Sequence, residues 1–366
     1  MASLSTRLNS KAKELPDITL NLESLQFESA LTSEQKKLLY LRVRSHAISV
    51  TLCAQASFFI DVYNEGRQLA IQLKNRQKRK ARILKDLCER DPLFIGVLGC
   101  GHVGSQIVHC LLTYGRVEPD ELAISTRRPE TLEYFQNKGV ECYFNNVKLV
   151  SSVHILFICV LPSQLPGVAE EIKDHLSPST VVYCTASSIP LKKLKQMLQT
   201  TNILQPDFYW ETGNNSNKDY DYNMKVGTAL KNRDIVEQTN PFTNKVEDLV
   251  IVPAKHFGEA LLHGFLNMLS DSGLTVEESL DILHCAMFCE TEKQTVKDRL
   301  KMEDFFCGKI DQQEKFPKFS LFEILENGSP LSPRIKQSPE LQESFSKRYW
   351  EVFEQYISLN AYNKVK

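Results

Sequence analysis

The sequence lacks a long hydrophobic run and an excess of charge of either sign. No stretch reaches the roughly eighteen apolar residues that a membrane-spanning helix needs, so we expect no membrane span. Lys and Arg number 44 against 45 Asp and Glu, and the net charge of −1 gives no overall attraction to nucleic acid. With 42% hydrophobic and 24% charged residues, the composition is that of an ordinary globular protein.

The ten cysteines form no CxxC pair and show no Cys/His spacing typical of a metal site, so we expect no metal. Most of them lie inside apolar segments, as in proteins of a reducing compartment. Arg7, Lys11 and Lys13 precede the first acid, Glu14, but the segment is poor in arginine and has a weak apolar face. We expect a cytoplasmic protein, with a mitochondrial location as the alternative.

A glycine-rich turn is the most informative feature of the chain. The apolar run Phe94–Leu98 leads directly into GCGHVG, and an apolar-periodic helix follows. In this strand–turn–helix context, the first glycine of GxGxxG permits a sharp turn and the second lets the backbone approach a pyrophosphate. The third lets the helix lie close to the strand. We therefore predict cofactor contacts at Gly99, Cys100, Gly101, His102, Val103 and Gly104.

The end of the next strand indicates which dinucleotide is bound. Glu121–Ser125 reads as a strand that ends about twenty residues after the turn, where NAD-binding units usually carry Asp or Glu. This chain has Ser125, Thr126, Arg127 and Arg128 there. Hydroxyls and guanidinium groups suit a 2′-phosphate, so the segment predicts NADP. The alternative is a solvated arginine pair at a helix start.

The rest of the chain divides into four parts by pattern. We predict a helical N-terminal extension (1–90), a Rossmann-type α/β domain with a parallel sheet (91–240), a smaller helical domain (250–307), and a linker with a C-terminal helix (308–366). Thr32 and Gln35 suggest a capping box, and a basic run at 74–85 reads first as a solvated helix face.

Within the α/β part, apolar runs and turn residues place the individual elements. The predicted strands are 140–144, 153–160, 181–184 and, more weakly, 224–230; the predicted helices are 130–138, ended by Gly139, and 189–198. Asp207–Asn223 reads as a long surface loop. Three Ser-Pro pairs, at Ser329, Ser332 and Ser338, suggest that 308–340 is a loose linker before a helix at 340–357.

Residues 94 to about 200 resemble the pyrroline-5-carboxylate reductase family, and residues 253–290 resemble it more faintly. Three stretches carry the resemblance, namely IGVLGCGHVG, STRR and LFICVLPSQL. That family consists of NADP-linked Rossmann enzymes with helical C-terminal dimerisation domains. The resemblance implies that Gly99, Gly101, Gly104, Ser125, Arg127 and Arg128 hold the dinucleotide. It also implies that Val160, Pro162 and Ala186 line the nicotinamide side, and that the chain forms a homodimer. The helices of 257–289 could equally bury against the N-terminal ninety residues.

The chain departs from the family where the substrate should bind. Leu161 stands where the family usually has Lys, and Leu249–Ala254 reads LVIVPA where the family has a Ser-Gly-Ser-Gly-Pro-Ala run. Leu, Val and Ile have no side-chain donors and rarely adopt positive φ, so they cannot hold a substrate carboxylate in the family's way. We therefore expect an NADP-dependent oxidoreductase whose unknown small-molecule substrate, a carbonyl or imine, is not pyrroline-5-carboxylate.

Lys255 and His256 are the candidate catalytic residues, because they open the helical segment directly after the altered loop. A surface lysine and a polar residue at a helix N-terminus are the structural alternatives. A different class of function also stays open, namely a non-catalytic NADP-binding or interaction protein. Nucleic-acid binding through residues 74–85 has little support, since no recognisable module accompanies the basic run.

Overall fold

The computed structural model describes residues 27–81, 91–209, 224–243, 251–288, 299–308 and 310–365. Within these residues a six-stranded parallel sheet forms the centre of the molecule, with the strand order β3-β2-β1-β4-β5-β6. This order, which reverses between β1 and β4, is that of a Rossmann fold and confirms the predicted fold class. The strands are β1 (Ile95–Leu98), β2 (Leu122–Ser125), β3 (Glu141–Tyr143), β4 (Ile155–Ile158), β5 (Val181–Cys184) and β6 (Ile203–Leu204).

Side chains of the central strands alternate between two hydrophobic clusters, one on each face of the sheet. Ile155 and Phe157 of β4 belong to one cluster, and Leu156 and Ile158 belong to the other. The second face is covered by α5 (Asn146–Ser152), α6 (Leu165–Ile172) and α7 (Leu191–Leu198). The first face carries α3 (His102–Tyr114) and the short α4 (Glu133–Gln136). The predicted helix 130–138 is a 3₁₀ turn, Pro129–Leu132, followed by α4, and Gly139 follows it with φ +99°.

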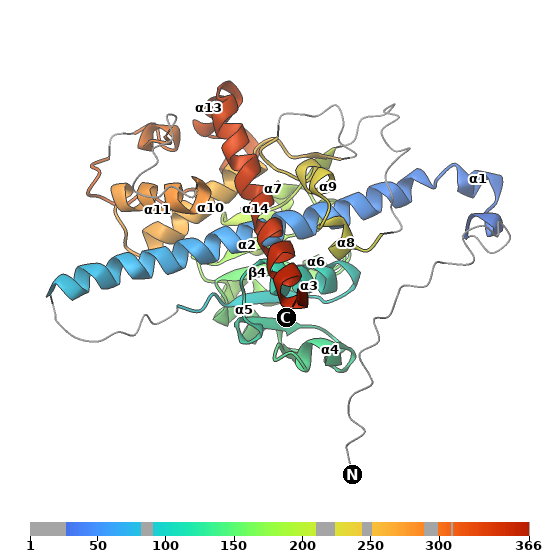
Figure 1. The fold of residues 1–366 in the computed structure, drawn as a ribbon. Helices are drawn as coiled ribbons and strands as arrows, with labels where there is room; N and C mark the ends of the chain where they lie inside the picture. The colour runs from blue at the N-terminus through green and yellow to red at the C-terminus, as the bar shows by residue number, and fades with distance from the viewer. Residues whose placement is uncertain are drawn as a thin grey trace, which may run out of the picture.

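The long helix α2 (Tyr40–Ala81, 42 residues) completes the cover of the first face. It crosses the whole molecule, and α14 (Pro339–Val365) lies across it (Figure 1). The helix runs through Gly66 without a break. The ring of Phe265 lies 2.2 Å from the place where a Cβ atom of residue 66 would be, so a glycine fits this contact. The predicted capping box at Thr32 and Gln35 is present at the start of α1 (Ser33–Lys36). The side chains of most of the basic run 74–85 lie outside the described residues.

Two further helices, α10 (Phe257–Asp271) and α11 (Val276–Phe288), pack within the same cluster as α2. Nearly every residue of α10 is buried, and its ring Phe257 meets Tyr183 of β5 edge-on at 6.0 Å. The sequence left open whether these helices bury against a second copy of the chain or against the N-terminal ninety residues. In the structure they contact the N-terminal segment, through α2. Dimerisation stays a prediction.

A buried ion pair fastens α14 to α2. The guanidinium of Arg348 donates to Asp61 and to Glu65, each at 2.8 Å, and Arg348 and Asp61 are 2% and 1% exposed. The Nε atom of Arg348 also donates to the carbonyl oxygen of Ala286 in α11. One side chain therefore joins three helices that are far apart in the sequence.

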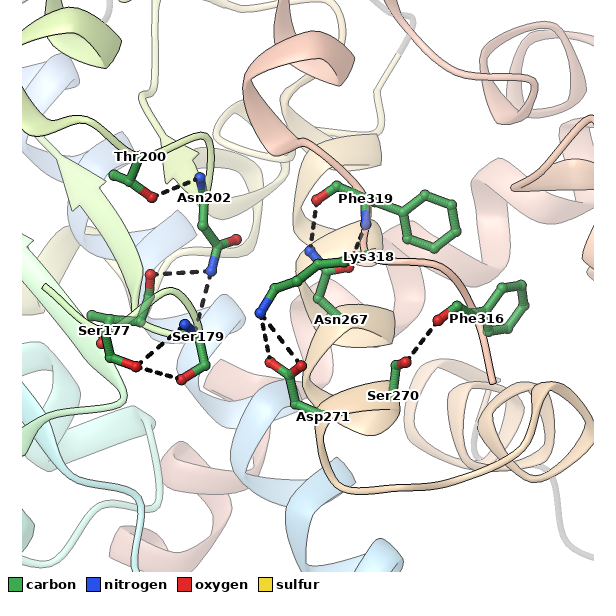
Figure 2. A network of polar contacts seen from close by, with 11 residues as sticks. Ser177, Ser179, Thr200, Asn202, Asn267, Ser270, Asp271, Phe316, Lys318 and Phe319 are labelled. Atoms are coloured by element: carbon green, nitrogen blue, oxygen red, sulfur yellow. Dashed lines mark hydrogen bonds and ion pairs between the residues drawn. The ribbon is translucent and has the colours of Figure 1, made fainter. Parts of the chain in front are cut away.

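The prediction of a loose linker at 308–340 is wrong. This segment contains α12 (Leu321–Asn327) and α13 (Leu331–Gln337), which bury leucine and isoleucine side chains, and the extended residues before them are held on α10. Figure 2 shows the Asn267 amide bonded to both the N–H and the carbonyl of Phe319, at 2.8 and 2.9 Å. Ser270 donates to the carbonyl of Phe316, and Lys318 pairs with Asp271 (Figure 2).

The strand predicted at 224–230 is also wrong, because this segment forms α8 (Val226–Ala229), followed by α9 (Arg233–Gln238). The buried residues Val226, Ala229 and Leu230 lie three and four positions apart, which is the spacing of a helix and not of a strand. Of the loop predicted at 207–223, only the first residues are described. They form β7 (Phe208–Tyr209), which pairs antiparallel with β8 (Val252–Pro253). Among the described helices, none is long and apolar enough to cross a membrane.

Candidate functional site

The glycine turn between β1 and α3 has the geometry that the sequence predicts. Gly99 has φ +88°, a conformation that favours glycine, and its N–H donates to the carbonyl of Ser125 at 2.9 Å. A Cβ atom on Gly104 would lie 2.3 Å from the carbonyl oxygen of Gly99. Internal packing therefore explains the first and the third glycine.

Gly101 differs from both, because a Cβ atom placed on it would meet no heavy atom within 4 Å. It is the N-cap of α3, and no side chain there caps the first turn of the helix. The open side of Gly101 and the N–H groups at the start of α3 are what a pyrophosphate requires. The residues of this turn thus fit a dinucleotide.

The remaining residues of the turn play different parts. His102 is exposed, and its Nε2 lies 3.1 Å from the amide nitrogen of Gln106, while Val103 packs against the core. Burial, followed by the nearby Cys142, raises the pKa of the Cys100 thiol to about 12. Cys100 therefore stays protonated at neutral pH and contributes an apolar surface, not a nucleophile.

At the end of β2, the four predicted residues divide into a buried one and an exposed pair. The Ser125 hydroxyl is buried and donates to Asn146 at 2.7 Å, so it supports the start of α5. The Thr126 N–H donates to the carbonyl of Tyr143 and fixes the turn. Arg127 and Arg128 are exposed, and within the described chain their guanidinium groups have no hydrogen-bond or ion-pair partner. These two cations are free to hold a phosphate.

The carboxyl ends of β4 and β5 lie next to the glycine turn. Val160 is half-buried, and its side chain lies 2.8 Å from where a Cβ atom of Gly99 would be. Pro162 is exposed. Ala186 is buried, and its carbonyl accepts a hydrogen bond of 2.9 Å from the Gln205 amide. These residues border the same edge of the sheet as the turn, and their contact with a nicotinamide stays a prediction.

The altered substrate segment lies beyond β6 at this edge. The N–H of Ala254 donates to the carbonyl of Asp207 at 2.8 Å, next to the β7–β8 pair. Ile251 is buried in a small cluster with Val43 and Ala47 of α2. In the described part of the segment, Ile251 thus packs on α2 and Val252–Pro253 form β8; Leu249 and Val250 lie outside the described residues.

A pocket of about 360 Å³ opens beside this segment, and only one of the two candidate catalytic residues lines it. Lys255 is exposed and lines it together with Lys336, and Phe242 is among its apolar residues. The His256 ring is turned instead toward α13, with Nδ1 at 3.1 Å from Glu259 and 3.3 Å from the Ser332 hydroxyl.

The carboxylate of Glu259 is the centre of a polar cluster that the sequence analysis missed. This buried group accepts hydrogen bonds from the Ser332 hydroxyl at 2.6 Å and from the Ser329 hydroxyl at 2.7 Å. The Ser329 N–H also donates to it. The sequence carried no signal for this cluster, since Ser329 and Ser332 lie some seventy residues after Glu259.

Comparisons with known proteins find similarity in the part of the chain that contains the glycine turn. The family model described as NADP oxidoreductase coenzyme F420-dependent matches residues 94–187, from β1 to just beyond β5. NADP-dependent oxidoreductase domain-containing protein 1 of Mus musculus is 31% identical over 353 residues, which is 92% of this chain and 94% of the mouse protein. The chain belongs to the family of this protein.

More distant relatives match about a third of the chain by sequence. Pyrroline-5-carboxylate reductase 1 of Dictyostelium discoideum is 24% identical over 105 residues, 29% of this chain and 19% of that protein. Pyrroline-5-carboxylate reductase of Escherichia coli is 26% identical over 105 residues, which are 28% of this chain and 39% of the bacterial enzyme. A solved pyrroline-5-carboxylate reductase from Coxiella burnetii aligns with a TM-score of 0.30 at 17% identity, over 74% of this chain and 99% of that one.

Proposed function

We propose that this chain is an NADP-dependent oxidoreductase of the pyrroline-5-carboxylate reductase-like type. The turn at Gly99–Gly104 supports dinucleotide binding, since Gly101 leaves open the side from which a pyrophosphate approaches. The observation that carries the choice of NADP is the pair Arg127 and Arg128, exposed at the end of β2 without partners in the described chain. When bound, NADPH supplies a hydride.

The proposed substrate is a small carbonyl or imine other than pyrroline-5-carboxylate. Support comes from the described part of the altered segment, where Ile251 is buried and Val252–Pro253 form β8, so that these positions offer no hydroxyl groups to hold a carboxylate. The pocket at Lys255 is large enough for a small substrate and combines apolar walls with amino and hydroxyl groups. Lys255 is the proposed proton donor, because its side chain lines this pocket.

The loss of the small-residue loop also favours a second candidate, a non-catalytic NADP-binding or interaction protein. Such a protein would bind the dinucleotide but turn over no substrate. We further propose a cytoplasmic location, because most of the cysteines lie inside apolar segments, as in proteins of a reducing compartment. A homodimer is the proposed assembly, and the oligomeric state in solution tests it.

The proposal is tested by titrating the protein with NADPH and NADH and following nicotinamide fluorescence. We expect tight binding of NADPH, weak binding of NADH, and loss of the difference in the variant Arg127→Ala/Arg128→Ala. The control Arg233→Ala/Lys193→Ala removes two exposed positive charges from α9 and α7 and should bind NADPH normally. Failure of both nucleotides to bind would overturn the assignment.

Substrate choice is tested separately by steady-state oxidation of NADPH. With pyrroline-5-carboxylate we expect no turnover above background, and turnover at an ordinary enzymatic rate would contradict the proposal. A screen of other small imines and carbonyls then separates the two candidate functions. Turnover that Lys255→Gln abolishes, with NADPH affinity unchanged, is the result expected for an enzyme.

A further inference from the structure

A second pocket, of about 570 Å³, is lined by residues of α3, by residues at and around α8, by His46 of α2 and by Tyr356 of α14. We call it the α3–α8 pocket. It begins beside the first turn of α3 and extends along the outer face of that helix. The lining residues that matter for its chemistry are His46, His102, Gln106, His109, Lys225 and Lys231.

The charge of this pocket is positive. None of its lining residues is Asp or Glu. Lys225 and Lys231 are exposed, and within the described part of the chain neither ammonium group has an ion-pair partner. Burial, followed by the nearby Lys138, lowers the pKa of His109, so that ring is neutral at pH 7 and serves as a hydrogen-bonding group. No carboxylate of the pocket lining therefore neutralises the charges of these two lysines.

The pocket is also lined by a side chain that can donate to an anion. The Gln106 amide nitrogen lies 3.1 Å from Nε2 of His102. An amide nitrogen carries two N–H groups, so Gln106 has a further donor for a ligand. The rim is fixed by His46, whose Nε2 lies 2.7 Å from the carbonyl of Met224.

We propose that the α3–α8 pocket binds a small molecule with at least two negative charges, such as a polycarboxylate or a phosphorylated metabolite. Lys225 and Lys231 neutralise its charges, and Gln106 and the histidine rings supply hydrogen bonds. The site is distinct from the one proposed for the dinucleotide 2′-phosphate, because Arg127 and Arg128 do not line it. Since His102 belongs both to the glycine turn and to this pocket, the two sites are neighbours.

The experiment is calorimetric titration of the ligand-free protein with citrate and, separately, with inorganic pyrophosphate. These probes distinguish carboxylate from phosphate recognition. We expect wild type to bind at least one of them saturably, and Lys225→Gln/Lys231→Gln to bind it about tenfold or more weakly. The control Lys193→Gln/Lys315→Gln removes two exposed lysines that do not line the pocket and should bind as wild type does.

Absence of saturable binding by wild type, or equal binding by both double variants, would overturn the proposal. A repeat in saturating NADPH tests whether the site is separate. Persistence of anion binding is the expected result, whereas complete displacement would assign the pocket to the dinucleotide. If NADPH does not bind at all, the titrations of the ligand-free protein still decide the matter.

Discussion

Gly104 lies so close to Gly99 that a Cβ atom on the first would be 2.3 Å from the carbonyl oxygen of the second. The N-terminal end of α3 is thus in contact with the backbone of the turn that follows β1. Gly101, between them, faces open space. Two glycines of one motif are therefore required by the fold, and the remaining one is free to serve a ligand.

This difference predicts opposite effects of Gly104→Ala and Gly101→Ala. The first must displace α3 from β1 and should lower the free energy of unfolding by about 1–3 kcal/mol. The second puts a methyl group in open space at φ −81°, so stability should change by less than about 1 kcal/mol. NADPH affinity should nevertheless fall at least about tenfold, because the methyl group blocks the pyrophosphate. Urea unfolding and nicotinamide fluorescence measure the two effects, and normal NADPH binding by Gly101→Ala would contradict the assignment.

The sheet and the glycine turn were predictable because their signals are local. The run VHILFICV at 153–160 contains β4, and Val181–Cys184 is β5 as predicted. A strand buried on both faces of a parallel sheet needs apolar residues at nearly every position, and such a short continuous apolar run is therefore recognisable in the sequence. Gly139 ended a helix, as expected, at a positive φ.

The rest depended on partners that lie far away in the sequence. Residues 316–319 read as a linker because no periodicity marks an extended segment whose backbone is bonded to Asn267. The cluster at Glu259 joins α10 to Ser329 and Ser332 across some seventy residues, and sequence spacing could not bring them together.

The buried ion pair between α14 and α2 predicts a large effect of Arg348→Met. Asp61 is 1% exposed, and without Arg348 only the half-exposed Arg116, at 2.7 Å, remains to neutralise it. Removing one partner of a buried pair should lower the free energy of unfolding by about 3–5 kcal/mol. The control Arg233→Met breaks an exposed pair with Glu237 and should leave the free energy of unfolding close to that of wild type. Urea unfolding of both variants makes the comparison; a similar small loss in each would show that Arg348 is dispensable.

The two hydrogen bonds between the Asn267 amide and the backbone of Phe319 predict a local effect of Asn267→Ala. The variant leaves an N–H and a carbonyl of a partly buried backbone without their partner and should lower the free energy of unfolding by about 2–4 kcal/mol. Hydrogen exchange should become faster in residues 316–327 and little changed in the sheet. Lys318→Ala, which breaks a half-exposed ion pair with Asp271, should leave exchange in this segment close to that of wild type. Uniformly faster exchange in Asn267→Ala would instead indicate general destabilisation.

His284 predicts how stability depends on pH. Burial in α11, followed by the nearby Arg299, lowers the pKa of this histidine from 6.5 to about 4. Between these values the unfolded chain takes up a proton at this residue and the folded chain does not, so acidification favours unfolding. The contribution of His284 to stability is therefore complete above pH 6.5 and declines toward pH 4, by at most about 1.4 kcal/mol per pH unit. In His284→Phe, whose ring cannot be protonated and packs beside Phe288, this part of the slope should disappear. Urea unfolding from pH 4.5 to 7.5 measures the slope, and an identical slope in the variant would mean that His284 remains able to bind a proton in the folded protein.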